Sequence, residues 1–405
     1  MRPTAGVAQG TVVSTAMDTD TFDYLVVGAG SAGAAAAVRL SDSGRFSVLL
    51  LDAGPADTSL WTRIPLGVSK VLAQGIYLRH FFTQPDPNMK HRAIYWPRGW
   101  VVGGSSTVNG MIWVHGTPHL FDEWASDGCP GWSYADLKPW FRAIESFSGG
   151  SDDYRGRSGP VSVTQYQPVD PMVDAFLDAF EQSGVGQRVE DFNSGGIGAS
   201  ANQYNLRRGL RCNTRMAYLD PAKGRQNLTV MTETMVHRVL LEAASGRPRA
   251  VGVLAHHGGR QIALKARREV ILCGGAFNSP QLLELSGVGC RDVLEAAGVP
   301  LILESPMVGE NLSEHVYSPI VYRSTEEVSW NRALRSPMGQ GRLALRWLST
   351  RAGPMASNTI TAQGFVPLPG GHPARADLKL QIQQASTAGN RGKGKMDLDA
   401  FPGVT

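Results

Sequence analysis

Three glycines near the start of the chain, Gly28, Gly30 and Gly33, have the spacing GxGxxG. In such a turn the first glycine permits a tight bend, the second lets a pyrophosphate approach the backbone, and the third lets the following helix pack closely. The N–H groups and positive dipole end of a helix beginning at Ser31 would bind the phosphates. Asp52, farther along, is the acid expected on a ribose hydroxyl. The pattern predicts a dinucleotide site and leaves FAD and NAD open.

The elements around this turn fit the same interpretation. Tyr24 to Val27 is a short apolar run that indicates a buried strand, and the alanine-rich segment 32–40 is typical of a helix ending near Gly44. The run "FSVLLLDAG" indicates a second buried strand that ends at Asp52. Strand, glycine turn, helix and strand in this order form a βαβ unit, which distinguishes the motif from a merely structural glycine turn.

A second stretch, "RGWVVGGSSTVNGM" at 98–111, concentrates small and hydrogen-bonding residues. A plain turn needs roughly two or three such residues. This stretch has seven, namely Gly103, Gly104, Ser105, Ser106, Thr107, Asn109 and Gly110. Apolar runs flank it, which disfavours an ordinary surface loop. We therefore expect a ligand to lie against this backbone.

Composition and charge exclude several classes of protein. The 405 residues, 42% apolar and 18% charged, are typical of a globular chain of two or three domains. The net charge of +4 is spread along the chain without a long basic run, so nucleic-acid binding is not expected. There is no GxSxG nucleophile elbow and no HExxH or Cys/His metal spacing, so neither a hydrolase nor a metal site is expected.

The cysteines and the leader bear on the compartment. Cys129, Cys212, Cys273 and Cys290 are far apart and form no CxxC pair, which indicates a reducing compartment without disulfides. No apolar run is long enough to span a bilayer. Residues 1–21 lack the apolar core of a signal peptide and are expected to be a disordered leader. The expected location is cytoplasmic.

Periodicity predicts further elements. Helical spacing runs through 121–145, with a break at Pro130, and again through 170–183. The segments 227–242 and 249–276 alternate like strands joined by hairpins. A Gly/Ser/Asp-rich connector at 148–159 is expected to be a domain boundary, and the pattern beyond residue 316 predicts no particular element.

The stretch "RGWVVGGSSTVNGM" resembles the first signature of the glucose–methanol–choline (GMC) family of flavin-dependent alcohol oxidoreductases, and "GAFNSPQLLELSGVG" at 275–289 resembles the second. The segments "HLFDEWASDGCPGWSYADLKPWF", "RCNTRMAYLDPA" and "MVGENLSEHV" are also similar to blocks of that family. The resemblance extends from about residue 22 to the end of the chain. It favours the choline-dehydrogenase-like, aryl-alcohol branch.

The resemblance implies that the dinucleotide is FAD. The segment 102–112 would wrap the flavin end, Val236 would contact the adenine side through its backbone, and Ala276 would lie near the pyrophosphate. The residues expected to contact FAD are Gly28, Gly30, Ser31, Ala32, Gly33, Asp52, Ala53, Val102, Gly103, Gly104, Ser105, Asn109, Gly110, Met111, Ile112, Val236 and Ala276.

Other polar residues have structural interpretations. Ser279 is expected to be the N-cap of a helix with Pro280 in its first position. His115 could line the active site, but a partly buried packing role is the preferred interpretation. His315 follows Glu314, where the family usually has aspartate, and a structural role is preferred for it as well. The adjacent histidines at 256–257 would point to opposite faces of a strand and could not share a metal.

The family's catalytic histidine and its partner lie in a C-terminal block that has no counterpart here, so no catalytic residue is assigned and the chain is expected to be truncated. The resemblance implies oxidation of a primary alcohol to an aldehyde by hydride transfer to FAD, with a quinone or oxygen as the electron acceptor. Hydroxynitrile lyases also occur in the family. The alternatives are a non-catalytic FAD-binding fragment or pseudoenzyme, and an NAD-dependent dehydrogenase, which would not explain the second glycine stretch.

The expected fold is α/β. A Rossmann-like FAD-binding domain would comprise 22–150 and 206–315, and a substrate-binding domain on an antiparallel sheet would comprise 151–205 and 316–405. Both domains would be incomplete because of the expected truncation.

Overall fold

The computed structural model describes residues 20–166, 170–243, 246–386, 398 and 403–405. Most of the expected leader, residues 1–19, lies outside the described residues. Thr21 is already the first residue of strand β1 and pairs with Lys265, so ordered structure begins before the predicted end of the leader. The described chain forms two compact units, which are treated separately below.

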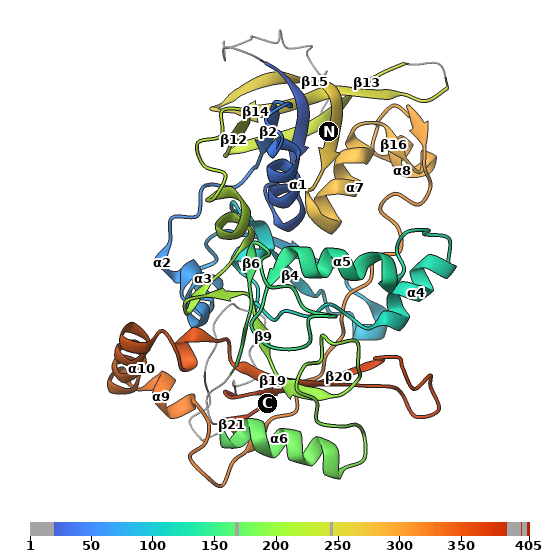
Figure 1. The fold of residues 1–405 in the computed structure, drawn as a ribbon. Coiled ribbons are helices and arrows are strands. Elements are labelled where there is room, and N and C mark those ends of the chain that lie inside the picture. The colour runs from blue at the N-terminus through green and yellow to red at the C-terminus, as the bar shows by residue number, and fades with distance from the viewer. Residues whose placement is uncertain (1–19, 167–169, 244–245, 387–397, 399–402) are drawn as a thin grey trace, which may run out of the picture. The chain divides into compact units, whose positions relative to one another are not determined.

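Unit 1 comprises residues 1–57, 99–105 and 218–315 and is built on a six-stranded mixed sheet, with the strand order β12-β2-β1-β15-β14-β13 (Figure 1). β12, β2, β1 and β15 run parallel, and β14 and β13 continue the sheet as antiparallel hairpins. The strands are β1 (Thr21–Val27), β2 (Val48–Leu51), β12 (Leu228–Met231), β13 (Thr234–Glu242), β14 (Arg249–His257) and β15 (Arg260–Leu272). This confirms the predicted α/β fold class, including the βαβ unit and the hairpins.

Helix α1 (Ser31–Ser41) connects the first two parallel strands, and its small residues explain how closely it lies against the sheet. Gly33, Ala34 and Ala37 are buried on its inner face. β2 is buried along its whole length because elements cover both faces of a parallel strand. The helix ends at Ser41, with the right-handed Asp42 as its C-cap, and the left-handed Gly44 follows three residues after Ser41, so the end lies near Gly44 as predicted but Gly44 is not the C-cap.

Helix α7 begins earlier than predicted. It spans Gly275–Leu285, so Pro280 lies inside the helix and Ser279 is not its N-cap. The positive φ of Gly275 (+82°) lets the chain turn into the helix one turn early, and the Asn278 side chain donates to the carbonyl of Gly274 at 3.1 Å. The other elements of this unit are β16 (Val288–Gly289), α8 (Arg291–Ala296) and β17 (Leu303–Glu304).

Unit 2 comprises residues 58–98, 106–217 and 316–405 and contains the antiparallel sheet β20-β19-β8, with helix α6 packed on all three strands (Figure 1). α6 (Pro171–Gln182) begins at the N-cap Asp170 and buries Val173, Leu177 and Phe180, as its amphipathic spacing predicts. The sheet strands are β8 (Ala199–Ala201), β19 (Ile360–Val366) and β20 (Leu378–Gln383). An antiparallel sheet was expected in the second domain, and the structure has one.

Unit 2 also contains further helices and mostly two-residue strands. The helices are α2 (Leu60–Arg63), α3 (Val68–Gln74), α4 (Pro118–Ser126), α5 (Tyr134–Ile144), α9 (Asn331–Arg335) and α10 (Pro337–Thr350). The strands are β3 (Leu78–Phe82), β4 (Tyr95–Gly99), β5 (Glu145–Ser146), β6 (Val161–Ser162), β7 (Thr164–Gln165), β9 (Gln203–Tyr204), β10 (Leu206–Arg207), β11 (Leu210–Arg211), β18 (Tyr322–Arg323) and β21 (Gly403–Val404). Helices α4 and α5 confirm the predicted helical region broken at Pro130.

The compact units divide the chain differently from the predicted domains. Residues 58–98, 106–150 and 206–217, which the prediction assigns to the FAD-binding domain, cluster in unit 2. The connector 148–159 lies inside unit 2 and is no boundary there, because it carries the fully buried Arg155. Which of the two units carries which function stays a prediction.

Candidate functional site

The glycine turn of unit 1 is held by contacts between backbone segments. Gly28 has φ +104°, and a Cβ at this position would lie 2.4 Å from the carbonyl oxygen of Cys273. A Cβ on Gly33 would lie 1.8 Å from the carbonyl oxygen of Gly28. Both glycines are therefore required by the packing of the protein on itself.

The two glycine-rich stretches meet within this unit. The N–H of Gly103 donates to the carbonyl of Ala29 at 2.8 Å, and Gly104 has φ +53°. A Cβ on Gly104 would lie 2.8 Å from the Cα of Gly30. The stretch 98–111 is therefore glycine-rich partly because the backbone of the first glycine turn lies against Gly103 and Gly104.

Gly30 differs from these glycines because nothing in the described protein requires it to lack a side chain. Its φ of −77° is ordinary for any residue. A Cβ here would meet only the Cα of Gly104, at 3.9 Å, which is normal van der Waals contact. Gly30 is also the N-cap of α1, where no side chain caps the helix. The space in front of Gly30 therefore fits the phosphate-binding role predicted from the sequence.

Asp52 follows β2, and its carboxylate connects the glycine turn to the segment that follows β2. Its two carboxylate oxygens accept hydrogen bonds from the N–H of Ala29 at 2.7 Å and from the N–H of Gly54 at 2.8 Å. Burial raises the pKa of Asp52, and the two backbone hydrogen bonds only partly offset it. Each ionised oxygen can accept more than one hydrogen bond, so the carboxylate can also accept from a ribose hydroxyl.

The segment Val102–Ser105 is hydrogen-bonded to the glycine turn and to the segment that follows Asp52. The N–H of Val102 donates to the carbonyl of Pro55 at 3.0 Å, and the hydroxyl of Ser105 accepts from the N–H of Gly99 at 3.1 Å. The turn, the Asp52 segment and the second glycine stretch thus form one cradle of backbone amides and a carboxylate. The residues present fit a dinucleotide with a pyrophosphate.

The other expected FAD contacts lie in different places. Ala276 is in the first turn of α7, shortly after the Cys273 that packs on Gly28. Val236 lies in β13, separated from β1 by β15 and β14, at an irregularity in the β13–β14 pairing. Their contact with FAD stays a prediction.

Asn109, Gly110, Met111 and Ile112 belong to unit 2. Met111 is 1% exposed and has φ +64°, a left-handed conformation that is unusual for a bulky residue. Ile112 forms a β-bridge with Tyr204. The three residues Asn109–Met111 are called the strained loop below. Such strain persists only where the surroundings enforce it, and it is enriched at functional sites.

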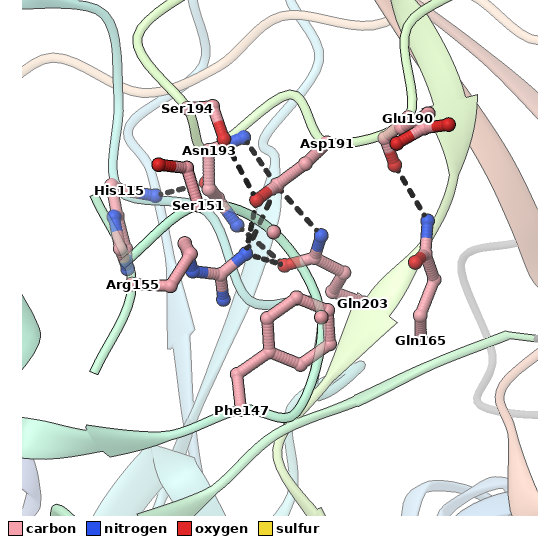
Figure 2. Close-up of polar contacts among 12 residues, drawn as sticks. His115, Phe147, Ser151, Arg155, Gln165, Glu190, Asp191, Asn193, Ser194 and Gln203 are labelled. Atoms are coloured by element: carbon pink, nitrogen blue, oxygen red, sulfur yellow. Dashed lines mark hydrogen bonds and ion pairs between the residues drawn. The ribbon is translucent and has the colours of Figure 1, made fainter. Parts of the chain in front are cut away.

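Sequence reasoning missed a buried charge cluster in unit 2, made of Glu145, Arg155 and Asp191. Arg155 binds both oxygens of Glu145 through Nε and Nη2, each at 2.8 Å, and both oxygens of Asp191 through Nη1, each at 2.9 Å. Figure 2 shows this guanidinium beside Asp191 and Gln203. Glu145 and Arg155 are 10 residues apart and Asp191 lies 36 residues after Arg155, so no contiguous motif marks the cluster.

Glu145 of this cluster and the nearby Asn193 hold the segment after the strained loop. The Asn193 side chain accepts from the N–H of His115 at 2.8 Å (Figure 2) and donates to the carbonyl of Trp113 at 3.0 Å. The Trp113 indole donates to Glu145 at 2.8 Å, and the His115 ring stacks on Phe141. His115 is buried, with its Nε2 3.1 Å from Glu145, so the packing interpretation of this histidine is confirmed.

The remaining histidines singled out by sequence have separate surroundings. His256 contacts the His237 ring at 2.7 Å, whereas His257 contacts the Thr234 hydroxyl at 2.9 Å. His315 is exposed. Among the described residues there is no group of three or more His, Cys, Asp or Glu side chains that could hold a metal ion. In the same part of the chain, no helix has both the length and the apolar character needed to cross a bilayer.

The charge cluster predicts a loss of stability in acid. Burial by itself raises the pKa of Glu145, but the hydrogen bonds and charge interactions with His115 and Arg155 outweigh it and lower the pKa to about 2. The pKa of a glutamate in an unfolded chain is about 4.3. The stabilisation of the folded state by Glu145 is therefore fully present above that pH and is lost as the pH falls toward 2. We expect this residue alone to remove about 3 kcal/mol from the free energy of unfolding over that window, measured by urea unfolding.

The control for this prediction is Glu145→Gln. This variant is less stable at neutral pH, and its free energy of unfolding should fall less steeply in acid, because Asp191, whose pKa is also lowered, still titrates. If the two proteins lose stability in parallel as the pH falls, Glu145 is not the group responsible.

Comparison with known proteins identifies the relatives of the chain. A sequence model described as GMC oxidoreductase matches residues 22–317. Oxygen-dependent choline dehydrogenase of Photobacterium profundum is 37% identical over 349 residues, which is 85% of this chain and 60% of that protein. The enzyme of the same name from Pectobacterium carotovorum subsp. carotovorum is 39% identical over 352 residues, 85% of this chain and 62% of that protein.

Among solved structures, pyridoxine 4-oxidase from Mesorbium loti is similar, with a TM-score of 0.80 and 28% identity. The similarity covers 94% of this chain and 69% of that one. The chain spans about 60% of the length of the curated relatives it matches.

Proposed function

The chain belongs to the GMC oxidoreductase family, whose members are FAD-binding flavoproteins. On this premise we propose that it is an FAD-dependent oxidoreductase that converts a primary alcohol to an aldehyde. When bound, FAD would accept the hydride of the alcohol carbon at flavin N5. One observation carries the proposal: Gly30 lies against Gly104, and Asp52 is hydrogen-bonded to the same turn, so the three segments form one backbone cradle.

Different segments of unit 1 would bind different parts of FAD. The first-turn amides of α1, from Ser31 to Gly33, would bind the pyrophosphate, because the helix has no side-chain cap and no acidic residue in its first turn. Asp52 would accept from a ribose hydroxyl while keeping its bonds to Ala29 and Gly54. The backbone of Val102–Ser105 would lie along the cofactor.

The substrate and the acceptor are inferred at the level of chemical class. Choline and pyridoxine, named in the relatives, are both small molecules with hydroxyl groups, which supports an alcohol substrate. A dehydrogenase that uses a quinone and an enzyme that uses oxygen both fit, and the relatives named oxygen-dependent support oxygen as an acceptor. The four cysteines are free thiols, which supports the proposal of a cytoplasmic location.

Gly30→Ala tests the cradle directly. The new methyl group fits the protein, so the free energy of unfolding of the protein without FAD should change little. The same methyl group would occupy the space proposed for the pyrophosphate, so we expect the FAD dissociation constant to rise ~100-fold or more. Fluorescence titration of the protein with FAD measures this.

The matched control is Gly341→Ala, a substitution in helix α10 where the added methyl also meets open space. It should leave FAD binding unchanged. Equal FAD affinity of Gly30→Ala and the unmodified protein would contradict the proposed site.

Activity is tested separately by the absorbance spectrum of the FAD-loaded chain under anaerobic conditions, before and after addition of a panel of primary alcohols that includes choline. Bleaching of the flavin bands by an alcohol supports the oxidoreductase proposal. Flavin bands that no alcohol bleaches would favour the alternative, a chain that binds FAD without turnover.

A further inference from the structure

The strained loop of unit 2 has hydrogen bonds to three separate elements. Its carbonyls at Asn109, Gly110 and Met111 each accept from a different residue: the Arg211 guanidinium at 2.8 Å, the Asn358 side-chain amide, and the backbone N–H of Asn205 at 3.0 Å. Three consecutive carbonyls with three independent donors fix the direction of every peptide group in the loop.

Arg211 makes the most contacts of the three donors. It lies in β11 and is completely buried. Besides the carbonyl of Asn109, it donates to the Asn109 side-chain oxygen at 2.8 Å, to the carbonyl of Ser106 at 3.0 Å and, through Nε, to the carbonyl of Thr62 at 3.0 Å. A planar guanidinium can satisfy this set of acceptors at once, whereas a lysine ammonium cannot reach them in the same geometry.

The Asn109 side chain connects Arg211 to the strained residue. Its Oδ1 accepts from Arg211 and also from the N–H of Met111, at 3.0 Å. That second bond closes a turn over Gly110 and holds Met111 at its positive φ. On the other side, Asn358 donates to Gly110 and its own Oδ1 accepts from the N–H of Ile360 at 2.8 Å, which ties the loop to β19.

We propose that Arg211 and Asn358 are positioning residues that hold Asn109–Met111 in its left-handed conformation, and that this conformation sets the surroundings of the redox end of the cofactor. The second half of the proposal rests on the proposed function and on the sequence prediction that Asn109–Met111 contact FAD. The first half concerns the protein alone and is testable without FAD.

The experiment compares four variants by hydrogen exchange of the backbone amides at 105–115 in the protein without FAD. Arg211→Met removes the guanidinium, Arg211→Lys keeps the charge, and Asn358→Ala removes the second donor. The matched control is Arg207→Met, because Arg207 lies on the same hairpin and also donates to backbone carbonyls, those of Pro160 and Met216, but not to the strained loop.

We expect exchange in the loop to accelerate ~10-fold or more in Arg211→Met and Asn358→Ala, with at most partial rescue by lysine and no change in Arg207→Met. Circular dichroism confirms that each variant is folded. If Arg211→Met does not fold, Asn358→Ala decides, because its donor to the loop comes from outside the hairpin. Equal protection of the loop in Arg207→Met and in the two loop variants would overturn the positioning role.

The second measurement is the absorbance spectrum and reduction potential of FAD bound to each variant. The proposal expects a changed band shape and potential in the loop variants, with the control like the unmodified protein. Unchanged values would overturn the link to the cofactor while leaving the exchange result valid. If the unmodified chain binds no FAD, the proposed function fails, and the exchange experiment still tests the positioning role.

Discussion

Gly33→Ala is expected to prevent unit 1 from folding stably. The added methyl carbon would lie 1.8 Å from the carbonyl oxygen of Gly28 and 3.0 Å from the Cβ of Cys273. Neither neighbour can retreat easily, because the N–H of Gly28 is bonded to β2 at 2.7 Å and the N–H of Cys273 to β1 at 2.7 Å. We expect a loss of about 4 kcal/mol or more in the free energy of unfolding, measured by urea unfolding.

Gly44→Ala is the control for this substitution, because Gly44 follows the same helix and has φ +69°, but a Cβ there would meet nothing within 4 Å. It should cost only the strain of a positive φ, about 1 kcal/mol. A Gly33→Ala variant as stable as Gly44→Ala would show that the helix and the turn can separate, contrary to the packing described here.

Arg155→Met is expected to destabilise unit 2 by about 3 to 5 kcal/mol, because it leaves two buried carboxylates without their cation. The Glu145 side chain is fully buried and that of Asp191 is 6% exposed, so water cannot replace the lost partner. The loss should be smaller in acid, where both carboxyls can be protonated. Urea unfolding at neutral and acid pH measures both effects.

Two companion variants separate charge from packing. Arg188→Met removes an exposed arginine whose pairs with Asp174 and Asp178 are 3.3 Å long, and it should cost less than about 1 kcal/mol. Adding Glu145→Gln and Asp191→Asn to Arg155→Met should recover part of the stability, since no buried charge remains. Failure to recover any would indicate that the hydrogen-bond geometry, and not the charge, stabilises the cluster.

The sequence predicted those parts of the structure that depend on neighbouring residues. The βαβ unit, helix α6 and the β13–β15 hairpins have strong periodicity and clear turn residues, and the structure has all of them. The start of α7 was predicted wrongly, because Ser279 and Pro280 form a typical N-terminal pair, and the flexible Gly274–Gly275 pair, which lets the helix begin earlier, was overlooked.

The candidate site was predictable only where a motif is contiguous. Gly28 to Gly33 and the stretch 98–111 stand out in the sequence, and the structure brings them together in unit 1 as far as Ser105. The buried cluster around Arg155 was not predictable, since its partners come from positions 145, 191 and 203 and each looks like an ordinary surface residue in its own segment. Long-range pairing of single polar residues leaves no local periodicity.

The contrast between Gly30 and the other glycines of the cradle bears on how such a chain would diverge. Gly28, Gly33 and Gly104 are required by contacts of the protein with itself, so selection for folding alone would retain them in a descendant that no longer used a nucleotide. Gly30 has no such constraint and would be free to acquire a side chain. The glycines required for folding could therefore remain after FAD binding was lost, whereas under the proposed function a side chain at position 30 would indicate that loss.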